Sequence, residues 1–178
     1  MNKTYVIAEI GINHNGDLNL AKELIFGAYE AGADAVKFQK RTINQVYSQE
    51  ELDKPRQSPW GTTNREQKLG LEFNIEQYKE LQSLAKDLKL DFIVSCWDEE
   101  SVDLVEKHLD VDYHKVASAL ATDKNFLLKL NNTQRPVILS TGMCTEEYID
   151  LAMQTLQNVE YVLACTSTNP TNPEEVNL

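Results

Sequence analysis

Long hydrophobic runs and an excess of basic residues are both missing from this sequence of 178 residues. A membrane-spanning helix needs about 18 consecutive apolar residues, which no stretch approaches. Residues 1–10 lack the charged start and long apolar middle of a signal peptide. Lysine and arginine number 17 against 28 aspartates and glutamates, so the formal net charge is −11. Nucleic acids and anionic membranes both favour basic surfaces. We therefore expect a cytoplasmic protein that binds neither.

Cysteine is scarce as well. Cys96, Cys144 and Cys165 are widely spaced and form no C-x-x-C pair. This pattern excludes a disulfide framework and a zinc site of the usual spacing. The content of 42% hydrophobic and 25% charged residues is that of an ordinary globular protein. The length suffices for one buried core and is short for two, so we expect one domain over residues 1–178.

Short apolar runs of β-forming residues alternate with amphipathic helical segments. Strands are predicted to begin near residues 5, 34, 91, 112, 136 and 160, and each of the first five is followed by a helix. Such a repeat, with strands buried on both faces, predicts a parallel sheet. A doubly wound sheet would bind at one crevice, and no glycine-rich fingerprint follows the first strand. The expected fold is therefore α/β, a TIM barrel of which about six of eight βα units are present.

The run Ala35-Val36-Lys37-Phe38-Gln39 places Lys37 and Gln39 on one face of a buried strand. A lysine in such a strand either meets an anionic partner or extends past the sheet end into water. Lys115 occupies the same kind of position in a second apolar strand, and Glu9 lies near the end of the first. These three residues are the candidate catalytic residues.

Further polar residues follow the carboxyl ends of the predicted strands, where a barrel carries its chemistry. The candidate substrate-binding residues are Gln39, Ser118, Ser140, Thr141 and Ser167. Two lysines with hydroxyls and backbone N–H groups would form a receptor for phosphate and carboxylate. A carboxylate such as Glu9 could bind sugar hydroxyls or move a proton. A Schiff-base lysine, as in class I aldolases, is the open alternative.

Residues 40–71 show no sustained period and contain prolines and glycines. A connection of this length is usually functional or disordered. Its cations Arg65 and Lys68 either reach a site or form a solvated face. Two residues near the first strand have expected local roles: Asp17 as the N-cap of a helix, and His14 as a hydrogen-bonding loop residue in preference to a ligand.

Four motifs, in order, resemble the N-acetylneuraminate (sialic acid) synthase family: Ala8-Glu9-Ile10-Gly11-Ile12-Asn13-His14-Asn15-Gly16, Gly32 to Gln39, Ile138 to Met143, and Cys165 to Thr168 with Pro170-Thr171. The resemblance implies an aldolase-type barrel that condenses phosphoenolpyruvate with an N-acyl hexosamine such as N-acetylmannosamine. The product would be a nine-carbon 2-keto sugar acid. A divalent metal, Mn or Mg, would polarise the aldehyde, with ligands outside this chain.

The same resemblance implies individual roles. Lys37, Lys115, Ser118, Ser140 and Ser167 are similar to the phosphoenolpyruvate contacts, and Glu9 and Gln39 to the sugar contacts. Leu120 stands where neuraminate synthases have glutamate, and Asn169 where the family usually has tyrosine, which leaves the hexosamine open.

Relative to the family, the chain ends after the sixth strand. We expect a fragment, a split gene product, or a chain completed by a partner or by its own dimer. The alternative function is a non-catalytic or partner-completed module that binds phosphoenolpyruvate and sugar.

Overall fold

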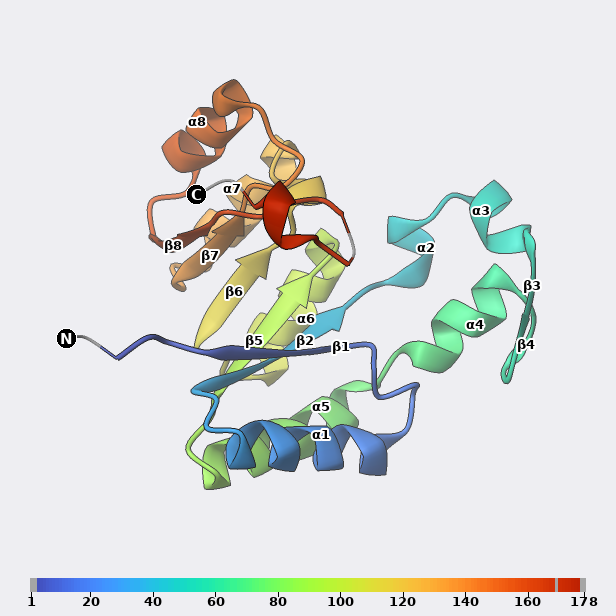
Figure 1. The fold of residues 1–178 in the computed structure, drawn as a ribbon. Coiled ribbons are helices and arrows are strands. Elements are labelled where there is room, and N and C mark those ends of the chain that lie inside the picture. The colour runs from blue at the N-terminus through green and yellow to red at the C-terminus, as the bar shows by residue number, and fades with distance from the viewer. Residues whose placement is uncertain (1–2, 169, 177–178) are drawn as a thin grey trace. The chain divides into compact units, whose positions relative to one another are not determined.

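A computed structural model describes residues 3–168 and 170–176. The chain divides into two compact units, Met1–Val111 and Asp112–Leu178. Figure 1 shows that each unit is built from strands connected by helices. The prediction of one domain over residues 1–178 stays a prediction, because the two units are described separately.

Three parallel strands form the sheet of the first unit. They are β1 (Ile7–Gly11), β2 (Ala35–Lys40) and β5 (Asp91–Cys96), with β2 paired to both neighbours. The helices that follow them are α1 (Leu18–Glu30), α5 (Ile75–Asp87) and α6 (Glu99–His108). Apolar side chains of β2 and β5, among them Val36, Phe38 and Phe92, are fully buried. The strands predicted near residues 5, 34 and 91 are confirmed.

Side-chain caps fix where these helices begin. Asp17 accepts hydrogen bonds from the backbone N–H groups of Asn19 and Leu20, as the sequence predicted. Asn74 forms a capping box with Gln77 at the start of α5, and Asp98 accepts from Ser101 at the start of α6.

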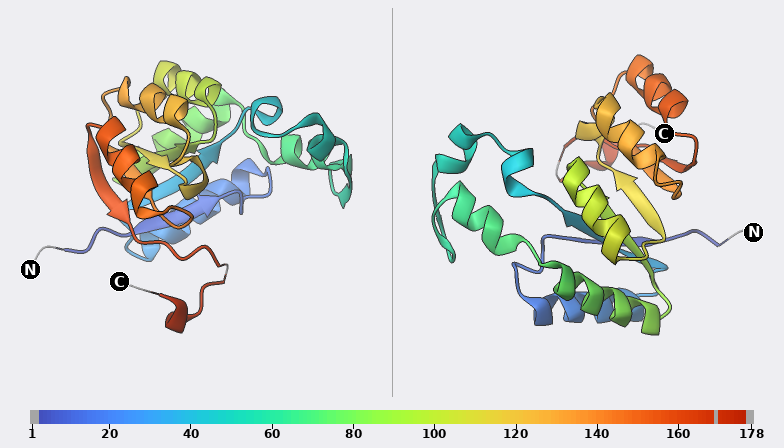
Figure 2. Two further views of the ribbon diagram at one scale, coloured as in Figure 1. Left: turned by 90° about the horizontal axis from the view of Figure 1, so that it is seen from above. Right: turned by 180° about the vertical axis from the view of Figure 1, so that it is seen from behind.

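The segment between β2 and α5 folds into an arm, residues 42–71. It contains α2 (Ile43–Val46), α3 (Gln49–Asp53), an antiparallel pair β3 (Pro55–Ser58) and β4 (Gly61–Thr63), and α4 (Asn64–Leu71). The views of Figures 1 and 2 agree that the arm extends away from α1 and α5. Of the two expectations for this stretch, disorder is wrong, and a functional role stays a prediction. Each element is too short for a hydrophobic period to show, and caps at Ser48 and Thr63 define α3 and α4 instead.

The second unit also carries parallel strands. They are β6 (Tyr113–Val116), β7 (Val137–Ser140) and β8 (Val159–Leu163), with β7 paired to both neighbours. The helical elements are η1 (Ser118–Leu120), α7 (Lys124–Asn131), α8 (Glu146–Thr155) and η2 (Pro173–Glu175). Thr145 is the N-cap of α8, but its side chain makes no capping hydrogen bond.

None of the helices in the described part of the chain is long and apolar enough to cross a membrane.

Candidate functional site

Lys37 and Glu9 form an ion pair at the centre of the first unit. They lie opposite each other in the β1–β2 register, and the Lys37 Nζ atom is 2.6 Å from the Glu9 Oε2 atom. The lysine side chain is 9% exposed and the glutamate side chain 55% exposed. A buried ammonium needs such a partner, because an unpaired charge is costly to remove from water. The alternative in which Lys37 extends into solvent is therefore wrong.

Backbone geometry at the end of β1 makes room for this pair. Gly11 has a φ of +54°, and a Cβ atom there would lie 2.7 Å from the Glu9 Oε1 atom. The Glu9 carboxylate therefore folds back over Gly11, where the positive φ would strain any other residue. The Gln39 side chain reaches the same place, with its Oε1 atom 4.0 Å from that Cβ position. The structure thus brings together the candidates Glu9, Lys37 and Gln39.

A charged cluster around Glu72 in the first unit was missed by the sequence analysis. Glu72 accepts from the Arg41 Nε atom at 2.7 Å and pairs with the Lys40 Nζ atom at 3.3 Å. All three side chains are at most 12% exposed. The cluster carries a net positive charge, and the Arg41 Nη2 atom has no hydrogen-bond partner among the residues described. Two consecutive cations after a buried strand, in an acidic chain, were the available signal.

His14 supports the loop that follows β1. Its ring stacks on Phe73 with centroids 4.1 Å apart, and its Nδ1 atom accepts a hydrogen bond from the Gly16 N–H at 3.1 Å. Burial lowers the pKa of this histidine, with a smaller opposing effect of the Glu72 charge. The expectation of a hydrogen-bonding loop residue is confirmed.

The two cations of the arm, Arg65 and Lys68, contact other residues of the arm. The Arg65 guanidinium binds the side-chain oxygens of Asn44 and Gln49, and the Lys68 ammonium lies 3.9 Å from the centroid of the Tyr47 ring. Neither is therefore a free cation for a ligand.

In the second unit, Lys115 and Ser140 share one side of the strands. Lys115 lies opposite Ile138, and Ser140 is two residues further along β7. Alternate residues of a strand point to the same face, so the ammonium and the hydroxyl project to one side. Ser140 is buried.

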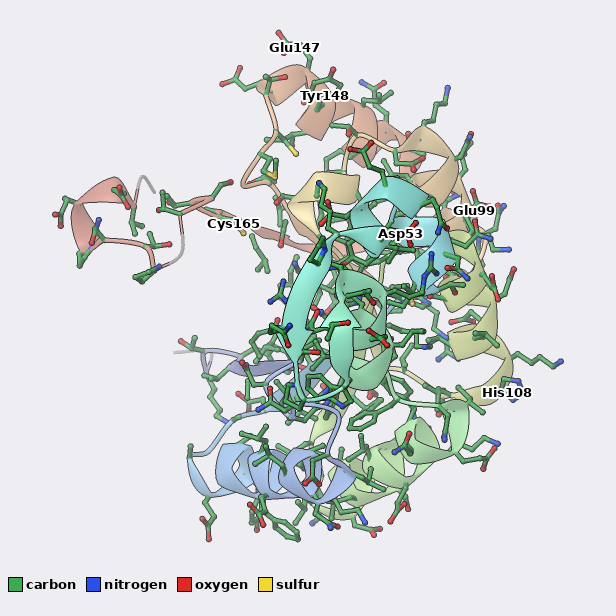
Figure 3. All side chains as sticks on the ribbon, turned by 90° about the vertical axis from the view of Figure 1, so that its right-hand side faces the viewer. Asp53, Glu99, His108, Glu147, Tyr148 and Cys165 are labelled. Atoms are coloured by element: carbon green, nitrogen blue, oxygen red, sulfur yellow. The ribbon has the colours of Figure 1, made fainter. Side chains whose placement is uncertain are left out.

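The loops after β7 and β8 bring the remaining hydroxyl candidates close to one another. The Ser167 hydroxyl donates to the Gly142 carbonyl at 2.5 Å, and the Thr141 hydroxyl donates to the Leu163 carbonyl at 2.9 Å. The Cys144 thiol lies 3.7 Å from the Ser118 carbonyl oxygen. Figure 3 shows the exposed Cys165 in the segment that follows β8. Leu120 belongs to η1, whereas Asn169 lies outside the described residues.

Lys37 and Lys115 belong to different units, so their predicted shared anion pocket stays a prediction. Within the described residues, no group of three or more histidine, cysteine, aspartate or glutamate side chains is placed to hold a metal ion. The described residues alone therefore offer no complete metal site.

Comparison with known proteins places this arrangement in a family. Residues 24–178 match the model of the NeuB family. The chain belongs to the NeuB family. It is 38% identical to the mouse (Mus musculus) N-acetylneuraminate-9-phosphate synthase, over 98% of this chain and 50% of that protein. It is 39% identical to the N,N'-diacetyllegionaminic acid synthase of Campylobacter jejuni, over 100% of this chain and 56% of that protein.

Solved structures agree with this NeuB assignment. The N-acetylneuraminic acid (sialic acid) synthetase of Leptospira borgpetersenii, in complex with citrate, is similar with a TM-score of 0.84 and 25% identity. The match covers 99% of this chain and 59% of that structure. The fold is thus the α/β, TIM-barrel type of the NeuB synthases, as predicted. The chain spans about half of the length of the relatives it matches.

Proposed function

We propose that this NeuB chain binds phosphoenolpyruvate and an N-acyl hexosamine for their condensation to a nine-carbon 2-keto sugar acid. In this reaction a bond forms between the methylene carbon of phosphoenolpyruvate and the aldehyde carbon. Water adds to the enol carbon, and inorganic phosphate leaves. Family membership supports sugar-acid biosynthesis, and we place the reaction in the cytoplasm.

The observation that carries the proposal is the ion pair between the buried Lys37 and the half-exposed Glu9, which lie opposite each other on β1 and β2. Lys37 would bind an anionic group of phosphoenolpyruvate, since charge-assisted hydrogen bonds to phosphate and carboxylate are strong. The incoming anion then competes with Glu9 for the ammonium. The half-exposed Glu9 carboxylate is released toward the sugar, where it accepts hydroxyl hydrogen bonds or moves a proton.

The remaining assignments follow the places of the side chains. Gln39 would contact the sugar beside Glu9. The proposed phosphoenolpyruvate contacts in the second unit are Lys115, Ser118, Ser140, Thr141 and Ser167. Lys115 lies in β6 and Ser140 ends β7, and the other hydroxyls lie in the segments that follow β6, β7 and β8.

We assign no step to a metal ion. In the family a divalent cation, Mn or Mg, is expected to polarise the aldehyde, and the residues described here offer it no ligand group. The second candidate is a non-catalytic or partner-completed module that binds phosphoenolpyruvate and sugar.

Calorimetric titration of the chain with phosphoenolpyruvate tests the proposal. Lys37→Met should weaken binding about 100-fold, the loss of a charge-assisted contact worth about 3 kcal/mol. Glu9→Gln should retain or tighten binding, because the competing carboxylate is gone. Lys79→Met, at an exposed lysine on α5, is the matched control and should bind as the wild type does.

Turnover separates the two candidates. Phosphate release is measured with manganese and a panel containing N-acetylmannosamine and its 6-phosphate. Release that is lost in Glu9→Gln supports the synthase, and binding without release supports the completed module. Phosphoenolpyruvate binding that Lys37→Met leaves unchanged would contradict both candidate functions.

A further inference from the structure

The opposite end of the same three strands carries a cavity that the proposed function does not use. Its volume is about 480 Å³, within the range of small-molecule sites. It is lined by residues that precede β1 and β2, end α1 or connect α5 to the start of β5, among them Tyr5, Tyr29, Asp34, Leu88, Lys89 and Asp91. Lys37 and Glu9 lie further along β1 and β2, so the cavity is separate from the candidate site.

Two carboxylates are held in place in this cavity. The Asp91 Oδ2 atom accepts a hydrogen bond from the Tyr5 hydroxyl at 2.5 Å. Asp34 pairs with Lys3, and its Oδ2 atom accepts from the Val6 backbone N–H at 2.9 Å. The hydrogen bond from Lys3 lowers the pKa of Asp34. Both carboxylates retain acceptor sites for ligand hydroxyls.

Lys89 supplies a cation at an unusual backbone position. Figure 1 shows α1 and α5 side by side, and each helix is followed by a residue with positive φ. After α1 that residue is Gly32, at +80°, as helix ends prefer. After α5 it is Lys89, at +60°, where a side chain is strained. The Lys89 ammonium makes no ion pair with the described residues, and strained positions gather at functional sites.

Part of the cavity lining is apolar. Tyr29, which is 50% exposed, and Leu88, the C-cap of α5, both belong to the lining. An exposed aromatic ring next to fixed carboxylates and a free cation offers an apolar face and polar edges together. A molecule with a carboxylate, several hydroxyls and an apolar C–H face would satisfy all of these groups.

We propose that this cavity binds a polyhydroxylated carboxylate, the chemical class of a sugar acid. The carboxylate pairs with Lys89, the hydroxyls donate to Asp34 and Asp91, and the C–H face lies on the Tyr29 ring. The site is distinct from the one that binds phosphoenolpyruvate. Only the choice of N-acetylneuraminate as the probe rests on the proposed function.

The test is a titration of the ¹⁵N-labelled full chain with N-acetylneuraminate, followed by amide chemical shifts. Shifts should gather at residues 29–34 and 88–91. Lys89→Gly should weaken this binding at least 10-fold and raise the denaturant midpoint, because glycine relieves the positive φ. Gln134→Gly is the matched control, since Gln134 has a φ of +61° in the second unit. It should leave the binding unchanged.

Further arms separate this site from the proposed function. Acetate, which lacks hydroxyls, and N-acetylmannosamine, which lacks a carboxylate, should each bind at least 10-fold more weakly. Lys37→Met should leave the shifts at residues 29–34 and 88–91 intact even where it abolishes phosphoenolpyruvate binding. Absence of these shifts in the wild type, equal binding by Lys89→Gly, or equal binding of acetate would overturn the proposal.

Discussion

At the scale of single residues, the candidate site depends on side chains whose partners lie far away in the sequence. Lys37 is buried because Glu9 lies opposite it on the next strand, and Glu9 can fold back because Gly11 has no Cβ atom. Both charged residues could be chosen from the sequence as strand-end polar residues. Their direct pairing could not, because strand register determines it and register depends on the whole sheet.

His14 makes the stability of the first unit depend on pH. The folded state lowers the pKa of this histidine from its usual value near 6.5. The contribution of His14 to the free energy of unfolding is therefore fully present above pH 6.5. It is lost as the pH falls through the lower pKa of the folded state, because the unfolded chain takes up the proton first. Removing the imidazole should cost about 1–3 kcal/mol at pH 7.5.

This prediction is checked by urea unfolding of the wild type and His14→Gln at pH 7.5, 6.5 and 5.5. The difference between them should shrink toward the lower pH. His108→Gln removes a partly exposed imidazole from the last turn of α6 and serves as the control. A difference that is constant with pH would show that His14 acts by packing alone.

At the scale of elements, the strands and long helices could be predicted and the arm could not. A continuous apolar run predicts a strand such as β5, and apolar residues at helical spacing predict a helix such as α5. The arm is held in part by polar contacts, one between distant positions, Arg65 with Asn44, and one local, the Thr63 capping box. Such contacts leave no periodic pattern, so a sequence window cannot detect them.

Glu72 clamps the two ends of the arm together. It binds Arg41 just before the arm and itself lies just after it. Replacing Glu72 with glutamine should destabilise the protein by about 3–5 kcal/mol, because two buried cations lose their only carboxylate in the cluster. Glu51→Gln is the control, since its pair with Lys54 is on the surface and should contribute about 0–1 kcal/mol.

Urea unfolding at neutral pH measures both changes, and protease cleavage within residues 42–71 reports whether the arm opens. Glu72→Gln should be cleaved there faster than Glu51→Gln. Equal stability of the two variants would mean that the cluster is no tighter than a surface pair.

At the scale of the whole molecule, family membership extends over both units, whereas the candidate residues are divided between them. Unit 1 holds Glu9, Lys37 and Gln39, and unit 2 holds Lys115 and the hydroxyl candidates. The sequence could predict these residues because all follow apolar runs. It could not predict the arrangement of the units, which depends on packing between distant segments.

The net charge sets how fast an anion reaches Lys37. At −11 the chain repels phosphoenolpyruvate at long range, and the buried ammonium attracts it only nearby. Raising the salt concentration from about 10 mM to about 150 mM shortens the screening length from about 30 Å to about 8 Å. The association rate constant should therefore rise a few-fold with salt, opposite to the usual behaviour of steered ligands.

Stopped-flow tryptophan fluorescence measures this association rate constant. The neutral N-acetylmannosamine should show no salt effect, and Glu76→Lys, at an exposed position on α5, should speed phosphoenolpyruvate association only at low salt. An association rate constant that falls with salt would instead show that the positive charge near Lys37 attracts the anion more strongly than the net charge of the molecule repels it.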